Sequence, residues 1–380
     1  MTEKLYYQNP YTFNFTATVL SCTQAGDNYL VELDRTAFFP EEGGQYADTG
    51  LLAGISVVDV KEKGGVILHT LTAPLPVGAE VTGQIDEPQR FRKMQNHTGE
   101  HIVSGLFHSL YGLSNVGFHL GHDDVTIDLD GELSREDLCR VEYLANEAIW
   151  KNLPIRAEFP SPEVLSTLDY RSKLELTENV RIVTVPGYDV CACCAPHVAY
   201  TGEVGQIKLL DFARYKGGVR IHMLCGVDAL ADYHARYTAT ATISAKLTAP
   251  QGEVAEAVNR LAADLQEKKQ QIARLQIALV EEILRALPDG DSPALFFEDR
   301  LDTAARRALV NGAAEKRPLA ALFAGNDETG YTFLMGSNTV DLRPFSRAMT
   351  SALGGKGGGS ATMVQGTLTA KRAEIEEYFN

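Results

Sequence analysis

Residues 253–287 constrain the fold more than any other part of the sequence, because they carry one long helical pattern. Apolar side chains recur there at heptad spacing, and Lys268 interrupts the pattern. At 1.5 Å per residue, such a helix spans roughly 50 Å. Its apolar stripe can pair with another helix of the same chain or with a second subunit, which would make a homodimer. The apolar positions are Val254, Val258, Leu261, Leu265, Ile272, Leu275 and Leu279.

The regions on the two sides of this helix predict several domains. With 380 residues, the chain exceeds the usual size of a single domain. Residues 1–90 alternate polar and apolar side chains in short runs separated by Gly, Pro and Asp, which predicts an antiparallel β-barrel. Residues 91–245 mix helical and strand patterns, as α+β domains do. With a helical linker at 250–288 and an α/β domain at 289–380, the sequence predicts an α+β multidomain protein.

The composition is that of an ordinary globular protein, with 44% hydrophobic and 22% charged residues. The N-terminal sequence lacks the apolar segment of a signal peptide, and no run of about 18 apolar residues follows it. Three of the six cysteines crowd into residues 191–194. In a reducing compartment such crowding indicates metal ligation or redox chemistry rather than disulfides. We therefore expect a cytoplasmic protein with no membrane partner.

The net charge of −15 argues against broad contact with phosphate groups. The charge is unevenly distributed, however. The first 299 residues carry 25 basic and 42 acidic side chains, whereas residues 300–380 carry ten and eight. Any contact with RNA should therefore rest on local basic patches, with the C-terminal domain as the better contributor.

Two pairs of metal-binding residue types share the same spacing. His97 and His101 lie four residues apart in a helical pattern, so their side chains are neighbours on one face. Cys193 and His197 repeat this offset in a turn segment far along the chain. Three imidazoles and one thiolate are good ligands for Zn²⁺, at about 2.0–2.3 Å. The sequence therefore predicts that both pairs together hold one Zn²⁺ per chain.

The pattern leaves one ligand open and disfavours protease chemistry. Cys191 and Cys194 lie next to the predicted cysteine ligand, and either could replace it. Metalloproteases place a Glu directly after the first histidine, whereas this chain has Thr98 there. Glu100 would point roughly 100° around the helix from His101. We therefore expect Glu100 to be a poor candidate for a base over the metal.

Four motifs follow one another along the chain, and together they resemble a known family. Their order is that of the editing domain of alanyl-tRNA synthetase and of its free-standing relatives, the AlaX alanyl-tRNA editing proteins. The long helix followed by residues 354–366 resembles the helical linker and the DHHA1-type C-terminal domain. The resemblance thus covers nearly the whole chain, as in the long form of AlaX. The motifs are Leu33–Gln45 (LDRTAFFPEEGGQ), His97–His101 (HTGEH), Cys193–His197 (CCAPH) and Gly218–Arg220 (GVR).

The resemblance implies editing in trans, because no ATP-binding synthetase domain precedes the expected barrel. The reaction would be hydrolysis of the ester in Ser-tRNA(Ala) or Gly-tRNA(Ala). By motif position, Thr36 and Gln45 should line the pocket that holds the metal. The Thr36 hydroxyl would favour serine and help to reject alanine, since a polar group that loses its partner discriminates strongly.

The resemblance also implies contacts with tRNA. The glycine-rich segment around Lys356 would offer backbone N–H groups as a cradle for phosphate. The residues expected to contact tRNA are Gly355, Lys356, Gly357, Gly358 and Arg220.

The sequence departs from the family pattern at two places. The family motif is usually Cys-Gly-Gly-Thr-His, so Cys194 and Pro196 change the turn that carries the ligands. Glu42 stands where the family usually has a third glycine, which could narrow the pocket or repel a substrate group.

Three other interpretations remain open. Four protein ligands make a closed site, like a structural zinc, so the chain could bind tRNA without hydrolysing it. It could also resemble the metal-independent editing domain of threonyl-tRNA synthetase, or act as a helper of a synthetase. No general base emerges from the motifs, so a neighbouring ribose hydroxyl would have to assist hydrolysis.

Overall fold

The structure is a computed structural model that describes residues 1–121, 125–172 and 180–380. The chain has the mixed α/β, multidomain architecture that its sequence predicts, and it divides into two compact units, residues 1–239 and 240–380. The division falls inside α5 (Gly226–Leu247), a helix that the sequence pattern did not reveal. The finer division into four domains stays a prediction.

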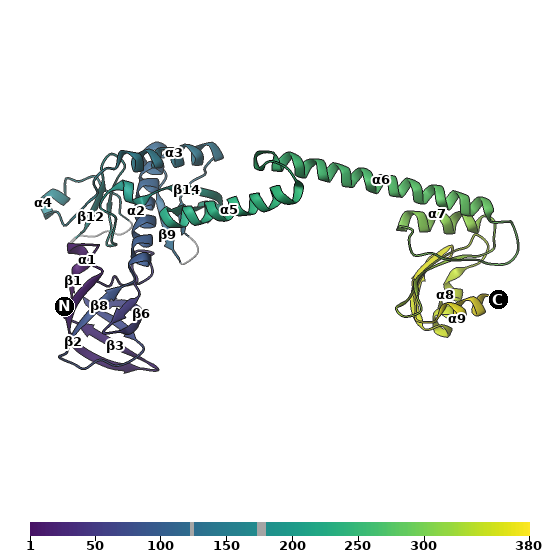
Figure 1. The fold of residues 1–380 in the computed structure, drawn as a ribbon, viewed down its shortest axis with the longest axis horizontal. Helices are drawn as coiled ribbons and strands as arrows, with labels where there is room; N and C mark the ends of the chain where they lie inside the picture. The colour runs from purple at the N-terminus through teal and green to yellow at the C-terminus, as the bar shows by residue number, and fades with distance from the viewer. Residues whose placement is uncertain (122–124, 173–179) are drawn as a thin grey trace. The chain divides into compact units, whose positions relative to one another are not determined.

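The first unit begins with a closed barrel of six strands (Figure 1), joined by hydrogen bonds in the order β2-β3-β7-β6-β5-β8. Side chains alternate between the buried interior and solvent, most regularly along β8. Before the barrel, β1 (Glu3–Lys4) and α1 (Leu5–Gln8) lead to a parallel pairing of β1 with β4 (Arg35–Thr36). The barrel strands are β2 (Asn14–Ala25), β3 (Asn28–Leu33), β5 (Gly50–Leu52), β6 (Ile55–Lys63), β7 (Val66–Leu71) and β8 (Glu80–Ile85).

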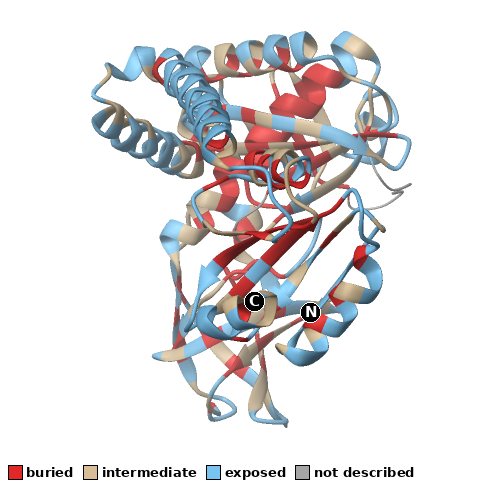
Figure 2. Ribbon diagram, turned by 90° about the vertical axis from the view of Figure 1, so that its right-hand side faces the viewer, coloured by how far each residue is buried: buried red, intermediate tan, exposed pale blue. Residues whose placement is uncertain are grey.

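Helix α2 (Glu87–Tyr111) follows the barrel and is the most deeply buried helix of this unit (Figure 2). The Asp86 side chain caps its first turn by accepting the N–H of Gln89, and Gly112 ends it in the left-handed conformation, φ 68°. Every residue from 93 to 107 is buried, polar ones included. A helix enclosed on all sides needs partners for its polar groups, and these partners define the site described below.

A buried ion-pair network joins α2 to the barrel loop. Arg90 Nε donates to Asp48 Oδ2 at 2.9 Å, and Lys93 Nζ lies 3.2 Å from Asp48 Oδ1. All three side chains are almost fully enclosed. Burial alone would raise the pKa of Asp48, but the two cations hold it below its usual value. One carboxylate thus serves two cations of α2, and these contacts fix the barrel loop and α2 together.

The rest of the first unit is an α+β layer with two further sheets. The larger sheet has the antiparallel order β14-β15-β10-β9, and the smaller has the order β11-β12-β13. Residues 135–150 have a helical pattern that follows Ser134 and has acidic residues in its first turn, which predicts a helix capped by Ser134. This helix is α3 (Arg135–Lys151), and Ser134 caps it in a capping box with Asp137. The elements are β9 (Asn115–Leu120), β10 (Val125–Leu129), α3 (Arg135–Lys151), β11 (Arg156–Glu158), α4 (Pro162–Leu165), β12 (Ile182–Val185), β13 (Asp189–Ala192), η1 (Thr201–Val204), β14 (Ile207–Tyr215) and β15 (Gly218–Cys225).

The second unit contains the predicted long helix and an α/β sheet domain. Helix α6 (Val254–Ala286) has 33 residues and follows a short turn, η2 (Gln251–Glu253). The sheet has the order β16-β17-β18-β20-β19. Its elements are β16 (Ala294–Phe297), α7 (Thr303–Ala314), β17 (Ala320–Asn326), β18 (Gly330–Gly336), α8 (Leu342–Ala352), β19 (Gly355–Gly359), β20 (Met363–Leu368) and α9 (Arg372–Phe379).

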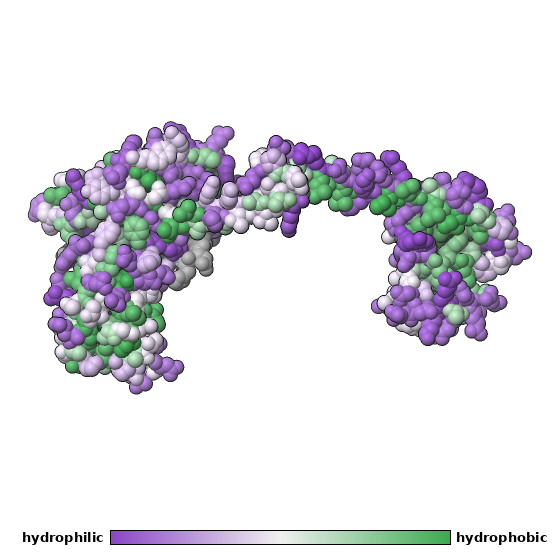
Figure 3. All heavy atoms as spheres, viewed as in Figure 1, coloured by the Kyte–Doolittle hydropathy of each residue, from purple (hydrophilic) through white to green (hydrophobic). Residues whose placement is uncertain are grey.

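The apolar stripe of α6 is largely exposed in the single chain. Green atoms mark it along the helix in Figure 3, and Leu275 is 70% exposed. Further exposed apolar side chains of α6 are Val258, Leu261, Leu265, Ile272 and Leu279. Across the described parts of the chain, no helix combines the length and the apolar character that crossing a membrane requires.

Candidate metal centre and cavity

The four predicted metal ligands come together in the first unit. Their donor atoms all lie within 4.8 Å of one another, and we call these residues (His97, His101, Cys193 and His197) the His/Cys cluster. The Cys193 sulfur lies 3.5 Å from His97 Nε2 and 3.3 Å from His197 Nε2. A tetrahedral Zn²⁺ at about 2.0–2.3 Å from each ligand separates the ligand atoms by roughly 3.3–3.6 Å. The donor types and their spacing therefore fit zinc.

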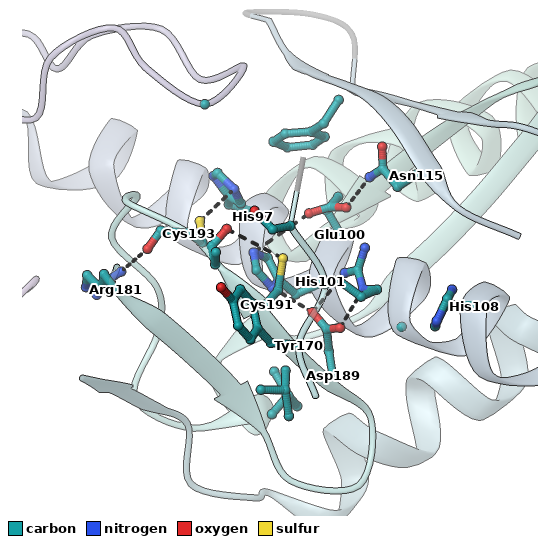
Figure 4. Close-up of a pocket in the computed structure, with 18 of the residues that line it drawn as sticks. His97, Glu100, His101, His108, Asn115, Tyr170, Arg181, Asp189, Cys191 and Cys193 are labelled. Carbon is teal, nitrogen blue, oxygen red and sulfur yellow. Dashed lines mark hydrogen bonds and ion pairs between the residues drawn. The ribbon is translucent and has the colours of Figure 1, made fainter. Parts of the chain in front are cut away.

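The outer nitrogen of His101 is held by a carboxylate. Its Nδ1 donates to Asp189 Oδ2 at 2.8 Å, and Arg171 fixes the same carboxylate through two hydrogen bonds of 2.7 and 2.9 Å. Figure 4 shows Asp189 beside His101, on the side away from Cys193. Because Nδ1 carries the proton, Nε2 presents its lone pair to the cluster, as metal-binding histidines require.

The other two histidines are oriented in the same way. Nδ1 of His97 donates to Gln45 Oε1 at 3.0 Å, so this barrel-loop residue lies buried behind the His97 ring and not in the cavity wall where the resemblance placed it. Nδ1 of His197 lies 3.2 Å from the Thr98 hydroxyl oxygen, which also accepts the N–H of Val198. All three imidazoles thus turn Nε2 toward one point, and this preorganisation favours a bound cation.

Two of the pKa shifts at the cluster match the protonation states that a metal needs, a thiolate at Cys193 and a neutral ring at His197, whereas His101 holds its proton more firmly. Burial alone would raise the pKa of the Cys193 thiol, but the rings of His97 and His197 hold it well below its usual range. Burial lowers the pKa of His197 to about 3. Burial also disfavours protonation of His101, yet its bond to Asp189 raises its pKa well above 6.5. A thiolate among imidazoles attracts a cation.

The structure distinguishes the three crowded cysteines. Cys193 is the one whose sulfur joins the three histidines. Cys191 instead forms a close group with His101 and Asp189, and burial raises the pKa of its thiol to about 11. The Cys194 sulfur lies under the Gly43 backbone, and burial raises the pKa of its thiol as well. Of the three cysteines that the spacing left open, Cys193 is the one placed among all three histidines.

A cavity of about 1000 Å³ opens beside the cluster. His97, His101 and Cys193 form part of its wall, and the loop residue Glu42 faces it from the barrel side. Tyr170 and Asp189 are among the other residues drawn around it in Figure 4. The space is large enough for an aminoacyl group with part of a nucleotide.

Glu100 lies closer to the cluster than its expected offset of roughly 100° from His101 suggests. Its Oε2 lies 3.9 Å from His101 Nε2, and the side chain lines the cavity. Its Oε1 accepts the Ser104 hydroxyl at 2.6 Å and the Asn115 side-chain amide. A helical side chain leans toward the N-terminus of its helix. The side-chain amide of Asn115, at the start of β9, donates to the Glu100 carboxylate and turns it from the direction that the helix alone would set.

Thr36 lies in the barrel interior and does not line the cavity. His69 Nδ1 donates to the Val31 carbonyl at 3.1 Å, so its Nε2 accepts the Thr36 hydroxyl at 2.8 Å. Burial lowers the pKa of His69 to about 4, which keeps this ring neutral. The Thr36 oxygen also accepts the N–H of Phe38 at 3.1 Å. The Thr36 hydroxyl, which was expected to contact the substrate, thus donates its proton to His69 inside the barrel.

Arg181 is a site residue that no sequence motif indicated. It is buried, and its Nη1 donates to the carbonyls of Cys193 at 3.0 Å and Ala195 at 2.9 Å. Its own carbonyl accepts the N–H of Cys193 at 3.0 Å. The turn with the unusual Cys-Cys-Ala-Pro-His sequence is therefore held from both sides by one residue. A buried arginine next to carbonyls reveals itself only in three dimensions.

The predicted tRNA contacts are distributed over both units. In the first unit, Arg220 forms two hydrogen bonds to Asp128, at 2.6 and 2.8 Å, and lies over the Tyr215 ring. In the second unit, residues 355–359 form the extended edge strand β19, paired with β20. The expected phosphate cradle around Lys356 is thus an exposed edge strand, and its contact with phosphate stays a prediction.

A groove lies beside this strand. It has a volume of about 610 Å³, and Lys356 lies in it with Arg306 and Arg307 of α7. The polar side chains Thr332 and Thr367 contribute to its floor.

Comparisons with known proteins agree with this site. Residues 180–222, which contain Cys193 and His197, match the family described as the threonyl and alanyl tRNA synthetase second additional domain. Residues 4–89 match the family described as tRNA synthetases class II (A). Two parts of the first unit thus match the class of domains found in tRNA synthetases.

One relative matches the chain almost from end to end. The alanyl-tRNA editing protein AlaX-L of Pyrococcus horikoshii is 30% identical over 99% of this chain and 96% of its own length. The chain belongs to the family of AlaX-L alanyl-tRNA editing proteins.

Alanine–tRNA ligases match a part of their length. The ligase of Ignicoccus hospitalis is 29% identical over 99% of this chain and 42% of its own length. The ligase of Natronomonas pharaonis is 32% identical over 90% of this chain and 39% of its own. The chain thus spans less than half of these ligases.

Proposed function

We propose that this protein hydrolyses the ester bond of Ser-tRNA(Ala), and of Gly-tRNA(Ala), after their release from a synthetase. The observation that carries this proposal is the His/Cys cluster at the wall of a cavity of about 1000 Å³ in a chain of the AlaX-L family. Hydrolysis requires a site that admits the aminoacyl end of a tRNA and presents polar groups to its ester. The volume of the cavity and the carboxylates of Glu42 and Glu100 in its lining support both requirements.

We propose that the His/Cys cluster holds one Zn²⁺. Such an ion would act as a Lewis acid toward a carbonyl or a bound water. The four protein donors resemble those of closed zinc sites. Binding and orientation of the substrate would therefore fall largely to the other residues of the site. Gln45 and Asp189 keep two of the ligand rings in place, and Glu42 and Glu100 present carboxylates to the cavity.

The groove of the second unit is our proposed contact for the tRNA backbone. It gathers Arg306, Arg307 and Lys356 in the less acidic part of the chain. The strand Gly355–Gly359 lets a phosphate approach the backbone closely, because four of its five residues lack side chains. Arg220, one-third exposed, would add a contact in the first unit. Cationic side chains supply most of the affinity for a phosphate backbone.

The exposed stripe of α6 supports a homodimer as a further proposal. Its heptad spacing matches what helix pairing between two copies requires. Sedimentation analysis of the full chain tests this directly. A monomer at all concentrations would contradict it.

A deacylation panel tests the proposed reaction. Ser-, Gly- and Ala-charged tRNA(Ala) are incubated with protein purified without a His-tag, with and without a chelator. We expect faster release of serine and glycine than in buffer, intact Ala-tRNA(Ala), and loss of activity with the chelator. No acceleration for any substrate would contradict the proposal.

The closed set of four ligands favours one alternative, a zinc-stabilised module that binds tRNA without hydrolysing it. Such a module would bind metal and charged tRNA tightly but leave the ester intact. If full activity persists in protein free of metal, the site instead works as a metal-independent editing domain like that of threonyl-tRNA synthetases.

A further inference from the structure

Glu100 is a buried carboxylate at the wall of the cavity, close to the His/Cys cluster. Its side chain is 6% exposed, and Oε2 lies 3.9 Å from His101 Nε2. This nitrogen is the one that faces the His/Cys cluster. A buried carboxylate is costly unless its position is supported by hydrogen bonds. Its presence at this point of the cavity therefore requires an explanation.

The support comes through Oε1. This oxygen accepts both the Ser104 hydroxyl and the Asn115 side-chain amide, and these two donors are also hydrogen-bonded to each other at 3.0 Å. In Figure 4, Asn115 and His101 lie on different sides of Glu100. The network fixes the carboxylate plane and turns Oε2 toward the cluster.

Glu100 is not needed to orient His101. Asp189 already accepts the Nδ1 proton of that ring, and Arg171 holds the Asp189 carboxylate. A second carboxylate that only oriented the ring would lie at Nδ1. Glu100 lies instead at the side of Nε2, where a substrate ester beside the cluster would meet it.

We propose that Glu100 is the catalytic residue that holds and activates the attacking water. The inference rests on the proposed hydrolysis. Oε2 accepts a hydrogen bond from the water and takes its proton as the water oxygen bonds to the ester carbonyl carbon. The tetrahedral intermediate then collapses, the bond between that carbon and the ribose oxygen breaks, and the same proton passes from Glu100 to the leaving ribose oxygen. Water and ester thus give a carboxylic acid and the free ribose hydroxyl.

The test compares Glu100→Gln with the wild type and with Glu87→Gln, an exposed residue of the same helix. In Glu100→Gln, the side-chain carbonyl can keep the bonds from Ser104 and Asn115, while the amide nitrogen replaces the accepting oxygen. Steady-state deacylation of Ser-tRNA(Ala) gives kcat and KM. The absorption spectrum of the Co²⁺-loaded protein reports on the cluster independently of activity.

We expect kcat of Glu100→Gln to fall by at least about 100-fold, with KM and the Co²⁺ spectrum unchanged, since a positioned base contributes about 10²–10⁴-fold. Glu87→Gln should match the wild type. If the wild type is active and kcat of Glu100→Gln falls less than threefold, the role of Glu100 is overturned while the proposed function stands. A change in the Co²⁺ spectrum of Glu100→Gln would overturn the same role. A wild type that leaves every ester intact would overturn the proposed function and this inference together.

Discussion

The two regions proposed to meet the tRNA are built in opposite ways. Around the His/Cys cluster, each imidazole has a partner for its outer nitrogen, and the histidines are buried. In the groove of the second unit, Lys356 and the strand that carries it are exposed. A reacting bond requires fixed geometry, whereas a phosphate backbone requires only accessible charge. We therefore expect substitutions in the first region to act on metal and rate, and those in the second to act on affinity.

Cys193→Ser should have the largest effect, because it removes the only thiolate of the cluster. We expect near-complete loss of bound metal and a fall in deacylation of more than 100-fold, which exceeds the 10–100-fold typical of residues that orient ligands. Metal analysis and single-turnover kinetics measure both quantities. Cys139→Ser, at an exposed free thiol, serves as the control. Full metal content in Cys193→Ser would show that another cysteine replaces this ligand.

Arg181→Met should have the next largest effect, through the turn that carries two ligands. Loss of the donors to the Cys193 and Ala195 carbonyls leaves both groups without this partner. We expect metal affinity to fall by about 10–100-fold, measured by competition with a chromophoric chelator. The metal affinity of Arg181→Lys, which keeps one donor group, should lie between those of the wild type and of Arg181→Met. Unchanged metal affinity in both variants would mean that the turn keeps its conformation without Arg181.

Lys356→Ala combined with Arg307→Ala should weaken tRNA binding severalfold while leaving the rate at saturating tRNA unchanged. Both cations line the groove, and each phosphate that is no longer neutralised reduces the salt dependence of binding by about one unit of slope. Binding isotherms at several salt concentrations measure the slope. Lys63→Ala removes an exposed cation of the barrel and is the matched control. An equal loss of tRNA affinity in the double variant and in Lys63→Ala would indicate a general effect of net charge.

Thr36→Val gives the smallest expected effect on catalysis and separates two views of this residue. Its bond to His69 predicts lower stability, by about 1–3 kcal/mol for an unsatisfied buried group, with serine and glycine discrimination unchanged. The family resemblance predicts altered discrimination instead. Thermal unfolding and the ratio of kcat/KM for the two substrates decide between them.

The sequence anticipated what depends on local spacing. The long helix, the cap at Ser134 and the two pairs of metal ligands all follow from periodicity or from fixed offsets, and the structure bears out the helix and the cap and brings the ligand pairs together. What depends on distant strands was not predictable. Asn115 draws Glu100 toward the cavity, and Arg181 reaches the ligand turn, through contacts that no spacing encodes.

The glycine-rich segment shows a different limit. Glycine is depleted in strands, and nothing in the glycine-rich segment around Lys356 indicates one, yet β20 pairs with residues 355–359 along the whole of β19. A neighbouring strand can impose extended geometry on residues whose own preferences are weak.

The buried network of Asp48 with Arg90 and Lys93 has a consequence for how the first unit unfolds. If the barrel separated from α2, two cations would lose their carboxylate, and His97 would lose Gln45 at the same time. Separation of the barrel from α2 would thus disrupt the His/Cys cluster. Any ion bound there would stabilise the joined form by mass action. Barrel and α2 should therefore melt in one cooperative transition whose midpoint rises with the concentration of free metal.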